Sequence, residues 1–118
     1  MSLMIQLGWP AKALSPNSRA HHMEKWRYAK ASKDTAFWAT RAVLGLSKFE
    51  HDGERIAVVL TAYPPDKRDR DSDNLLASAK SLLDGIALSL GVNDKFFDPR
   101  VQWGEPCKHG KLVVEIRP

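Results

Sequence analysis

The hydrophobic positions of the chain follow two different periods, and each period predicts a different kind of element. The short run from Met4 to Trp9 predicts a strand, and the β-branched run from Arg55 to Tyr63 predicts a buried strand that stops at Pro64-Pro65. Apolar side chains three and four residues apart predict a long helix from about His21 to Leu46. The apolar stripe of that helix is expected to comprise Trp26, Ala29, Phe37, Thr40 and Leu44.

A second helix is predicted after the charged segment Asp66 to Asp73, with Gly91 as its C-terminal cap. Its apolar residues recur with a period near 3.6, so one face is expected to pack against the core. These residues are Leu75, Leu76, Ala79, Leu82, Leu83, Ile86 and Leu90.

Two further strands are predicted at Val101 to Glu105 and Lys111 to Arg117, paired with each other across a turn at His109-Gly110. The order strand, helix, strand, helix, two strands predicts an α/β (α+β) fold. We expect a mixed sheet of about four strands with two main helices packed on one side of it. At 118 residues the chain is expected to form a single domain over 1–118, with Met4 as its natural start.

Composition narrows the class of protein. The net charge of +4 and the sequence pI of about 9.4 suit a polyanionic partner. No run approaches the ~20 apolar residues of a membrane span, so no membrane partner is expected. The single cysteine, Cys107, excludes an intramolecular disulfide and favours a reducing compartment, which we take to be the cytoplasm. We interpret Cys107 as a loop cysteine.

The segment Asp69-Arg70-Asp71-Ser72-Asp73 is the part of the sequence that indicates chemistry. In extended chain, residues two apart point to the same side, so Asp71 and Asp73 can aim their carboxylates at one point. Carboxylate oxygens suit Mg²⁺ or Mn²⁺, which take one or two protein carboxylates and complete their coordination with water and phosphate oxygens.

Two alternatives compete with this interpretation. An EF-hand calcium loop begins with the same pattern, but Asn74 stands where its glycine is required and Lys80 where its bidentate glutamate is required. The other alternative is structural: the aspartates cap the second helix and pair with Arg68 and Arg70 in a solvated loop.

The polar side of the second helix offers a cation near the aspartates. At ~100° per residue, Asp73, Ala77, Lys80 and Asp84 are expected to lie along a single line off the core face of this helix. A phosphodiester nuclease can use both charges, because a lysine stabilises the charge that develops on phosphate. The alternative is a surface pair of Lys80 with Asp84 that contributes little.

In this order and spacing the chain resembles the RusA-type Holliday junction resolvases, endodeoxyribonucleases common in phages and prophages. The resemblance is strongest between Pro64 and Asp94. Its residues are Ser15-Pro16-Asn17, Pro64-Pro65, Arg70-Asp71-Ser72-Asp73-Asn74, Lys80, Leu83-Asp84-Gly85 and Gly91-Val92-Asn93-Asp94.

The resemblance implies that Asp71, Asp73 and Asp94 bind Mg²⁺, with Mn²⁺ as a substitute, and that Lys80 is the catalytic lysine. Two positions depart from the family pattern. The family lysine stands four residues after the second aspartate, at Ala77 here, and the second aspartate of the family's acidic loop is Lys95 here, which leaves Asp98 as a second choice for the third carboxylate.

The resemblance also implies a homodimer that resolves four-way DNA junctions by paired nicks, each leaving a 5′-phosphate. Two rival functions stay open: a related nuclease of flaps, forks or single strands, and an inactive DNA-binding phage protein of the same fold. The expected phosphate contacts are the basic residues before the acidic segment and those of the first helix. They are Lys67, Arg68, Arg70, Lys25, Arg27 and Lys30.

Overall fold

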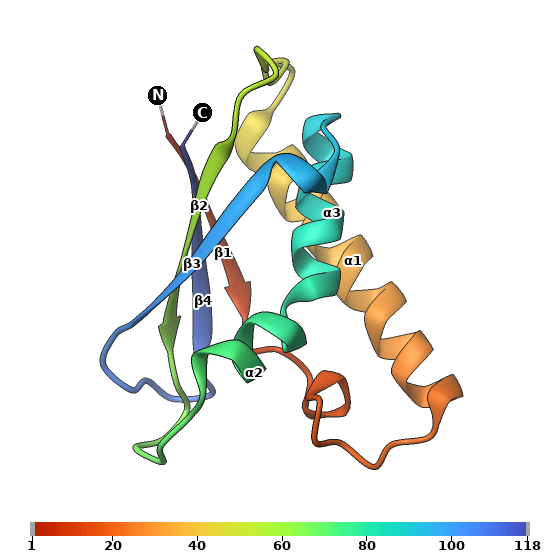
Figure 1. Ribbon diagram of the computed structural model, residues 1–118, viewed down its shortest axis with the longest axis vertical. Coiled ribbons are helices and arrows are strands. Elements are labelled where there is room, and N and C mark those ends of the chain that lie inside the picture. The colour runs from red at the N-terminus through yellow and green to blue at the C-terminus, as the bar shows by residue number, and fades with distance from the viewer. Residues whose placement is uncertain (1, 118) are drawn as a thin grey trace.

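A computed structural model describes residues 2–117 and shows one four-stranded mixed sheet covered on one side by helices (Figure 1). The strands are β1 (Leu3–Gly8), β2 (Ile56–Tyr63), β3 (Phe97–Trp103) and β4 (Lys111–Arg117), in the order β1-β4-β2-β3. β3 pairs with β2 in parallel, whereas β4 is antiparallel to both β1 and β2. The predicted α+β class is confirmed.

The predicted hairpin between the last two strands is wrong. β3 and β4 are not hydrogen-bonded neighbours, because β2 lies between them. β3 reaches its parallel position beside β2 through a helical crossover, which a parallel pair requires. β4 then returns antiparallel on the other edge of β2, with Leu60 opposite Val114. Local turn signals around His109-Gly110 marked the loop correctly but not the pairing.

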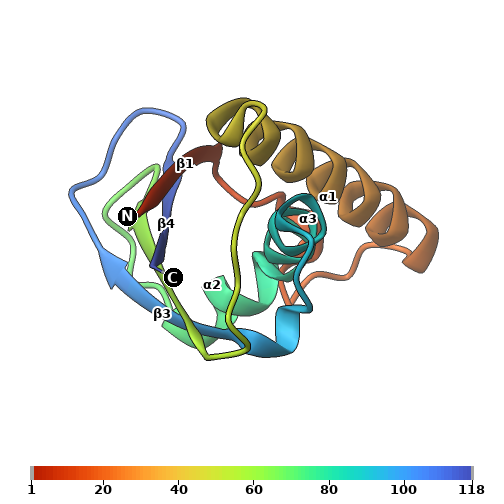
Figure 2. The same ribbon diagram turned by 90° about the horizontal axis from the view of Figure 1, so that it is seen from above.

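All the helices lie on the same face of the sheet (Figure 2). They are α1 (His22–Leu44), α2 (Ser72–Ser78) and α3 (Lys80–Leu90), with short 3-10 turns η1 (Lys12–Leu14) and η2 (Asp94–Phe96). Alternate strand residues such as Ile5, Leu60 and Val114 are fully buried beneath them. Among residues 2–117, none of the helices combines the length and apolar character needed to cross a membrane.

The contact between α1 and α3 is built from small residues. A Cβ added to Gly85 of α3 would lie 2.2 Å from the Lys33 carbonyl oxygen of α1 and 3.1 Å from the Ala36 Cβ. Such a close approach leaves no room for a side chain at Gly85. Further along, the Arg41 guanidinium donates to the Ser89 carbonyl oxygen at 2.6 Å and ties the two helices together. The two helices therefore run in the same direction, side by side.

The predicted apolar stripe of α1 is only partly right. Ala36, Thr40 and Leu44 are its buried residues, as the sequence predicted for two of them. Trp26, however, is 58% exposed. The reason is length: α1 has 23 residues and α3 has 11, or about 35 and about 17 Å at 1.5 Å per residue. The N-terminal half of α1 therefore extends beyond its partner.

The predicted second helix is interrupted. Ala79, at φ −92° and ψ 1°, ends α2 and begins α3, so the two helices meet at a bend (Figure 1). The Ala79 amide still donates to Leu75 and Leu76 carbonyl oxygens, and Gly91 caps α3 in the left-handed conformation as predicted. Because of the bend, Asp73 lies on one helix while Lys80 and Asp84 lie on the other. The single polar line predicted for these residues does not form.

Candidate metal and DNA-contact site

The two aspartates of the candidate site lie at the start of α2, just after the loop that follows β2. Asp71 is the N-cap residue, with extended backbone, and its Oδ1 accepts a 2.7 Å hydrogen bond from the Asp73 amide. Both side chains belong to exposed residues. Negative charge is favoured at this end of a helix because of the exposed amides and the helix dipole. We call Asp71 and Asp73 the α2-start pair.

The start of α2 is fastened to the end of β3. The Trp103 indole Nε1–H donates to the Ser72 Oγ at 2.9 Å. Trp103 is itself placed by the adjacent Gly104, where a Cβ would lie 2.4 Å from the Tyr63 ring. This bond joins the last residue of a sheet strand to the residue between Asp71 and Asp73. The α2-start pair is thereby held relative to the sheet.

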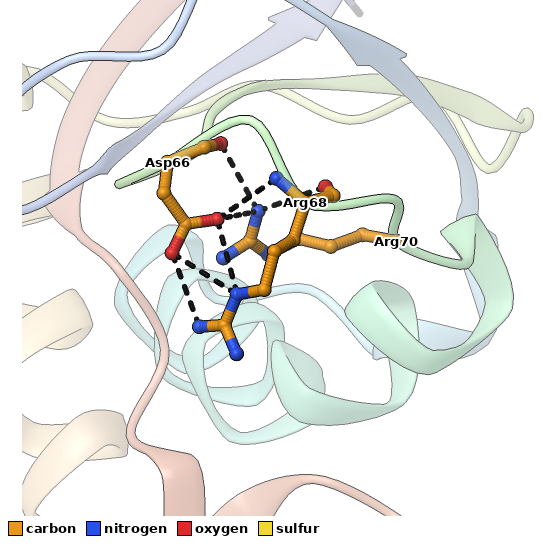
Figure 3. A network of polar contacts seen from close by, with 3 residues as sticks. All are labelled: Asp66, Arg68 and Arg70. Atoms are coloured by element: carbon orange, nitrogen blue, oxygen red, sulfur yellow. Dashed lines mark hydrogen bonds and ion pairs between the residues drawn. The ribbon is translucent and has the colours of Figure 1, made fainter.

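The basic loop before the pair is organised around Asp66 (Figure 3). The Arg68 Nη2 and the Arg70 Nη1 lie 3.0 and 2.9 Å from the carboxylate oxygens of Asp66. Hydrogen bonds from Arg68 and then Arg70 hold the pKa of Asp66 well below its ordinary range. Of the predicted phosphate contacts in this loop, the two arginines therefore already have an acidic partner, and it is Asp66.

The three basic residues of this loop differ in solvent exposure and in the number of contacts that hold their side chains. The Arg70 guanidinium lies 5.4 Å from the centre of the Trp9 ring, bonds to the carbonyl oxygens of Asp66 and Arg68, and is only 19% exposed. Lys67 and Arg68 are exposed. An open hollow of about 430 Å³ lies between this loop and the residues from Trp103 to Pro106. Arg70 braces the loop, while Lys67 and Arg68 face solvent beside the hollow.

The predicted lysine lies in a second cluster, which we call the lysine group: Lys80, Asp84 and Asp94. The Lys80 Nζ lies 2.8 Å from the Asp84 Oδ1 and 2.9 Å from the Asp94 Oδ2. These hydrogen bonds, that to Asp84 first, raise the pKa of Lys80, and Lys80 lowers the pKa of Asp94. The structure thus brings Lys80 and Asp94 together, as the resemblance implies. It also keeps Lys80 protonated, which excludes it as a general base near neutral pH.

The carboxylate oxygens that have no other charged partner decide what kind of metal site this region could form. Within residues 2–117, no three histidine, cysteine, aspartate or glutamate side chains are grouped so that they could hold a metal ion. Ion pairs of the described residues engage Asp66, Asp84 and Asp94 but neither Asp71 nor Asp73. Asp71 and Asp73 are therefore left without a charged partner among the described residues, and a Mg²⁺ that they hold with water and phosphate completing its shell is a prediction. A three-carboxylate site including Asp94 stays a prediction.

The remaining predicted residues lie apart from this region. Lys25, Arg27 and Lys30 are on the projecting half of α1, where Lys25 is half-buried and the other two are exposed. Lys30 lies 3.5 Å from the Asp34 carboxylate, a loose surface pair. Asp98, the second choice for the third carboxylate, lies on β3 at 3.8 Å from the Arg100 guanidinium.

Sequence reasoning missed two residues that shape the site. Asp66 could have been found, because an acidic residue two and four positions before arginines is a recognisable charge pattern. Trp103 could not, since its role depends on the parallel pairing of β3 with β2, which brings it beside Ser72. The structural alternative for the aspartates is confirmed in one respect, because Asp71 does cap α2.

Comparison with known proteins finds a relative across nearly the whole chain. Over 114 residues, 95% of this chain and 74% of the relative, the chain is 33% identical to an uncharacterized protein of Xylella fastidiosa (strain Temecula1 / ATCC 700964). No family model matches the chain.

Proposed function

The chain and the Xylella fastidiosa protein belong to one family, and we propose that this chain is a Mg²⁺-dependent, structure-selective DNA endonuclease that resolves four-way junctions. In this proposal it acts in the cytoplasm as a homodimer, because paired nicks in a junction of approximate two-fold symmetry suit a two-fold dimer. The RusA-type resemblance supports the choice of substrate, and the positions of the acidic and basic side chains near the start of α2 support the chemistry.

One observation carries the proposal: two exposed carboxylates, which form no ion pair with any residue from 2 to 117, stand at the start of a helix, next to exposed basic side chains. Asp71 and Asp73 form the acidic part, and Lys67 and Arg68 the basic part. A carboxylate pair by itself repels phosphate. A cation between the carboxylates reverses that repulsion, and neighbouring lysine and arginine hold the flanking phosphates. This combination is typical of phosphodiester hydrolysis rather than of a purely structural loop.

Each residue then has a defined part in the reaction. Asp71 and Asp73 would hold Mg²⁺, which supplies Lewis-acid stabilisation of charge on the scissile phosphate. Water adds to phosphorus and the bond from phosphorus to the 3′ oxygen breaks, which gives a 3′-hydroxyl and a 5′-phosphate. Trp103 keeps the start of α2 in place through Ser72. Lys67 and Arg68 bind the flanking phosphates without reading bases.

The lysine group has a separate part. Lys80 is protonated and holds Asp94 by a 2.9 Å ion pair. Because its ammonium has two carboxylate partners, it can approach a phosphate only by exchanging one of them. We assign Lys80 electrostatic stabilisation of the phosphate and assign Asp94 the task of holding Lys80 until DNA binds.

The test is a panel of labelled four-way junctions, flaps, forks, single strands and duplexes, each incubated with Mg²⁺, with Mn²⁺ and with chelator. We expect symmetric paired nicks in the junction with either cation and none with chelator. Preferential cutting of flaps, forks or single strands would replace the junction as substrate. Absence of cleavage on every substrate with both cations would refute the nuclease assignment.

A second candidate is a DNA-binding protein of the same fold without nuclease activity. The lysine group favours it, because Asp94 is neutralised by Lys80 instead of joining Asp71 and Asp73. The same panel decides between the two. Binding of branched DNA in chelator together with no cutting in Mg²⁺ or Mn²⁺ would support the second candidate.

A further inference from the structure

The projecting half of α1 presents exposed aromatic side chains to solvent. It extends from His22 to Lys33. The close approach of α1 to Gly85 of α3 begins at the Lys33 carbonyl oxygen and continues at Ala36. Trp26 is 58% exposed and Tyr28 is 45% exposed. A single exposed aromatic side chain is common on a protein surface, so the side chains around these rings decide whether this half of the helix forms a binding surface.

Trp26 is surrounded by basic and flexible neighbours on its own face. Met23 and Lys30 lie three and four residues away, and Lys33 seven, so all follow the same side of the helix. Lys30 and Lys33 are both exposed. From His22 to Asp34 four lysine and arginine residues stand against Glu24 and Asp34, and Asp34 forms a loose, exposed pair with Lys30 at 3.5 Å.

The charge of this surface favours a polyanionic partner. The core of a protein interface is depleted of charged side chains, whereas a groove for single-stranded nucleic acid combines basic residues with aromatic rings. We propose that the projecting half of α1 binds a single-stranded segment of DNA, with Trp26 stacked on an unpaired base and Lys30 and Lys33 on the flanking phosphates. This inference deepens the proposed function and takes the identity of the polyanion from it.

Unpaired bases are the part of DNA that an exposed indole can recognise. In a duplex the bases are already stacked on one another, so a surface ring gains little from them. At a junction, fork or flap, bases next to the branch can leave the stack and offer a free face to Trp26. The surface would therefore add selectivity for open DNA, in addition to the phosphate contacts near the α2-start pair.

A matched control lies on the same helix. Trp38 is also exposed, at 66%, but its charged neighbours one turn away are Asp34 and Arg41, and the Arg41 guanidinium is engaged with the Ser89 carbonyl oxygen. The Trp38 ring packs edge-to-face on Phe37 at 4.9 Å. Trp26→Ala and Trp38→Ala remove the same side chain from the same helix. They differ in whether lysines surround it.

The experiment measures binding of a labelled oligothymidine of about 15 nucleotides, and of a duplex of equal length, by fluorescence anisotropy in chelator. Stacking on one base contributes enough that Trp26→Ala should weaken single-strand binding by about 5- to 150-fold. Duplex binding should change less than about twofold. Trp38→Ala should leave both unchanged within about twofold, and thermal melting should confirm that both variants fold.

The outcomes separate this inference from the nuclease proposal, because no metal or cleavage enters the measurement. Loss of single-strand binding confined to Trp26→Ala supports the inference even if the chain cuts no DNA. Equal loss for the two tryptophan variants, equal loss on single strand and duplex, or no loss would overturn it. The inference would also be overturned if sedimentation showed that Trp26→Ala converts a dimer to a monomer. The surface would then be the interface with a second copy of the chain.

Discussion

The α2-start pair and the lysine group each contain two aspartates, but only the lysine group also contains an ammonium that balances their charge. Asp84 and Asp94 share the Lys80 ammonium at 2.8 and 2.9 Å, whereas Asp71 and Asp73 enter no ion pair among residues 2–117. A carboxylate that already has an ammonium partner must lose it before it can bind a metal ion. Spacing in the sequence can therefore indicate candidate metal ligands. The ion-pair partners that the fold provides decide which of those carboxylates are available to a metal ion.

The largest expected effect is on cleavage. Asp71→Asn or Asp73→Asn should lower Mg²⁺-dependent cutting by about a hundredfold or more, because each removes a charge that holds the ion. Asparagine caps a helix about as well as aspartate, so folding should be preserved. The control is Asp69→Asn, in the same loop but outside α2, which should stay within about threefold. Rates of junction cutting in Mg²⁺ provide the measurement, and near-normal cutting by Asp73→Asn would move the site elsewhere.

Metal binding should also change stability. An ion that binds the folded state alone stabilises it by roughly 2.7 kcal/mol at a hundredfold excess over its dissociation constant. We expect wild type to melt higher in Mg²⁺ than in chelator. Asp73→Asn should respond less to Mg²⁺, because one of the two charges that hold the ion is gone. If the melting temperature of wild type does not rise with Mg²⁺ and Asp73→Asn is only less stable, the aspartates have a structural role and do not bind metal.

The lysine group can be tested with Lys80→Met, which keeps the length of the side chain but removes its charge. Cutting should fall by roughly ten- to a hundredfold if the ammonium stabilises the phosphate. The free energy of unfolding should fall by less than about 1 kcal/mol, because the pairs are exposed and screened by salt. Cleavage rates and urea unfolding are both needed. If stability falls and cutting does not, the lysine group is a surface ion pair.

The hydrogen bond from Trp103 of β3 to Ser72 of α2 is expected to have a smaller effect on cleavage. Trp103→Phe removes the indole N–H that reaches Ser72 but keeps an aromatic ring beside Trp9, 6.4 Å away between ring centres. Cutting should fall by about tenfold, because small displacements of positioned groups are costly. Metal affinity from the melting series should fall in parallel, and Ser72→Ala should reproduce the change. Normal rates for both variants would show that the bond does not position the pair.

The smallest effect is expected at Asp66. Its folded pKa is depressed, so its stabilising contribution is complete above its ordinary pKa of 3.8 and is lost as the pH falls through the lower folded value. Asp66→Asn should therefore be slightly less stable than wild type near pH 6, and the difference should shrink between pH 4 and pH 2.5. Urea unfolding at these pH values is the check. A difference that grows toward acid would contradict the assigned ion pairs with Arg68 and Arg70.

The residues that sequence analysis placed well are those whose signal is local. The strand from Ile56 to Tyr63, the helix from His22 to Leu44 and the αL cap at Gly91 were predicted closely, since hydrophobic period and glycine conformation act within a few residues. The bend at Ala79 left no signal, because alanine is the strongest helix former. Pairing of β3 with β2 instead of β4 involves strands more than thirty residues apart in the chain.

The sequence by itself determined which side chains are acidic, basic or aromatic, the periods that make them helical or extended, and the cap that starts α2. Only the tertiary structure decided which of those charges are neutralised and which surfaces are covered. Lys80 meets Asp94 because η2 packs back against α3, and Trp26 stays exposed because α3 is shorter than α1. Both outcomes depend on distances between elements, and such distances are set by packing of the whole chain rather than by any segment of it.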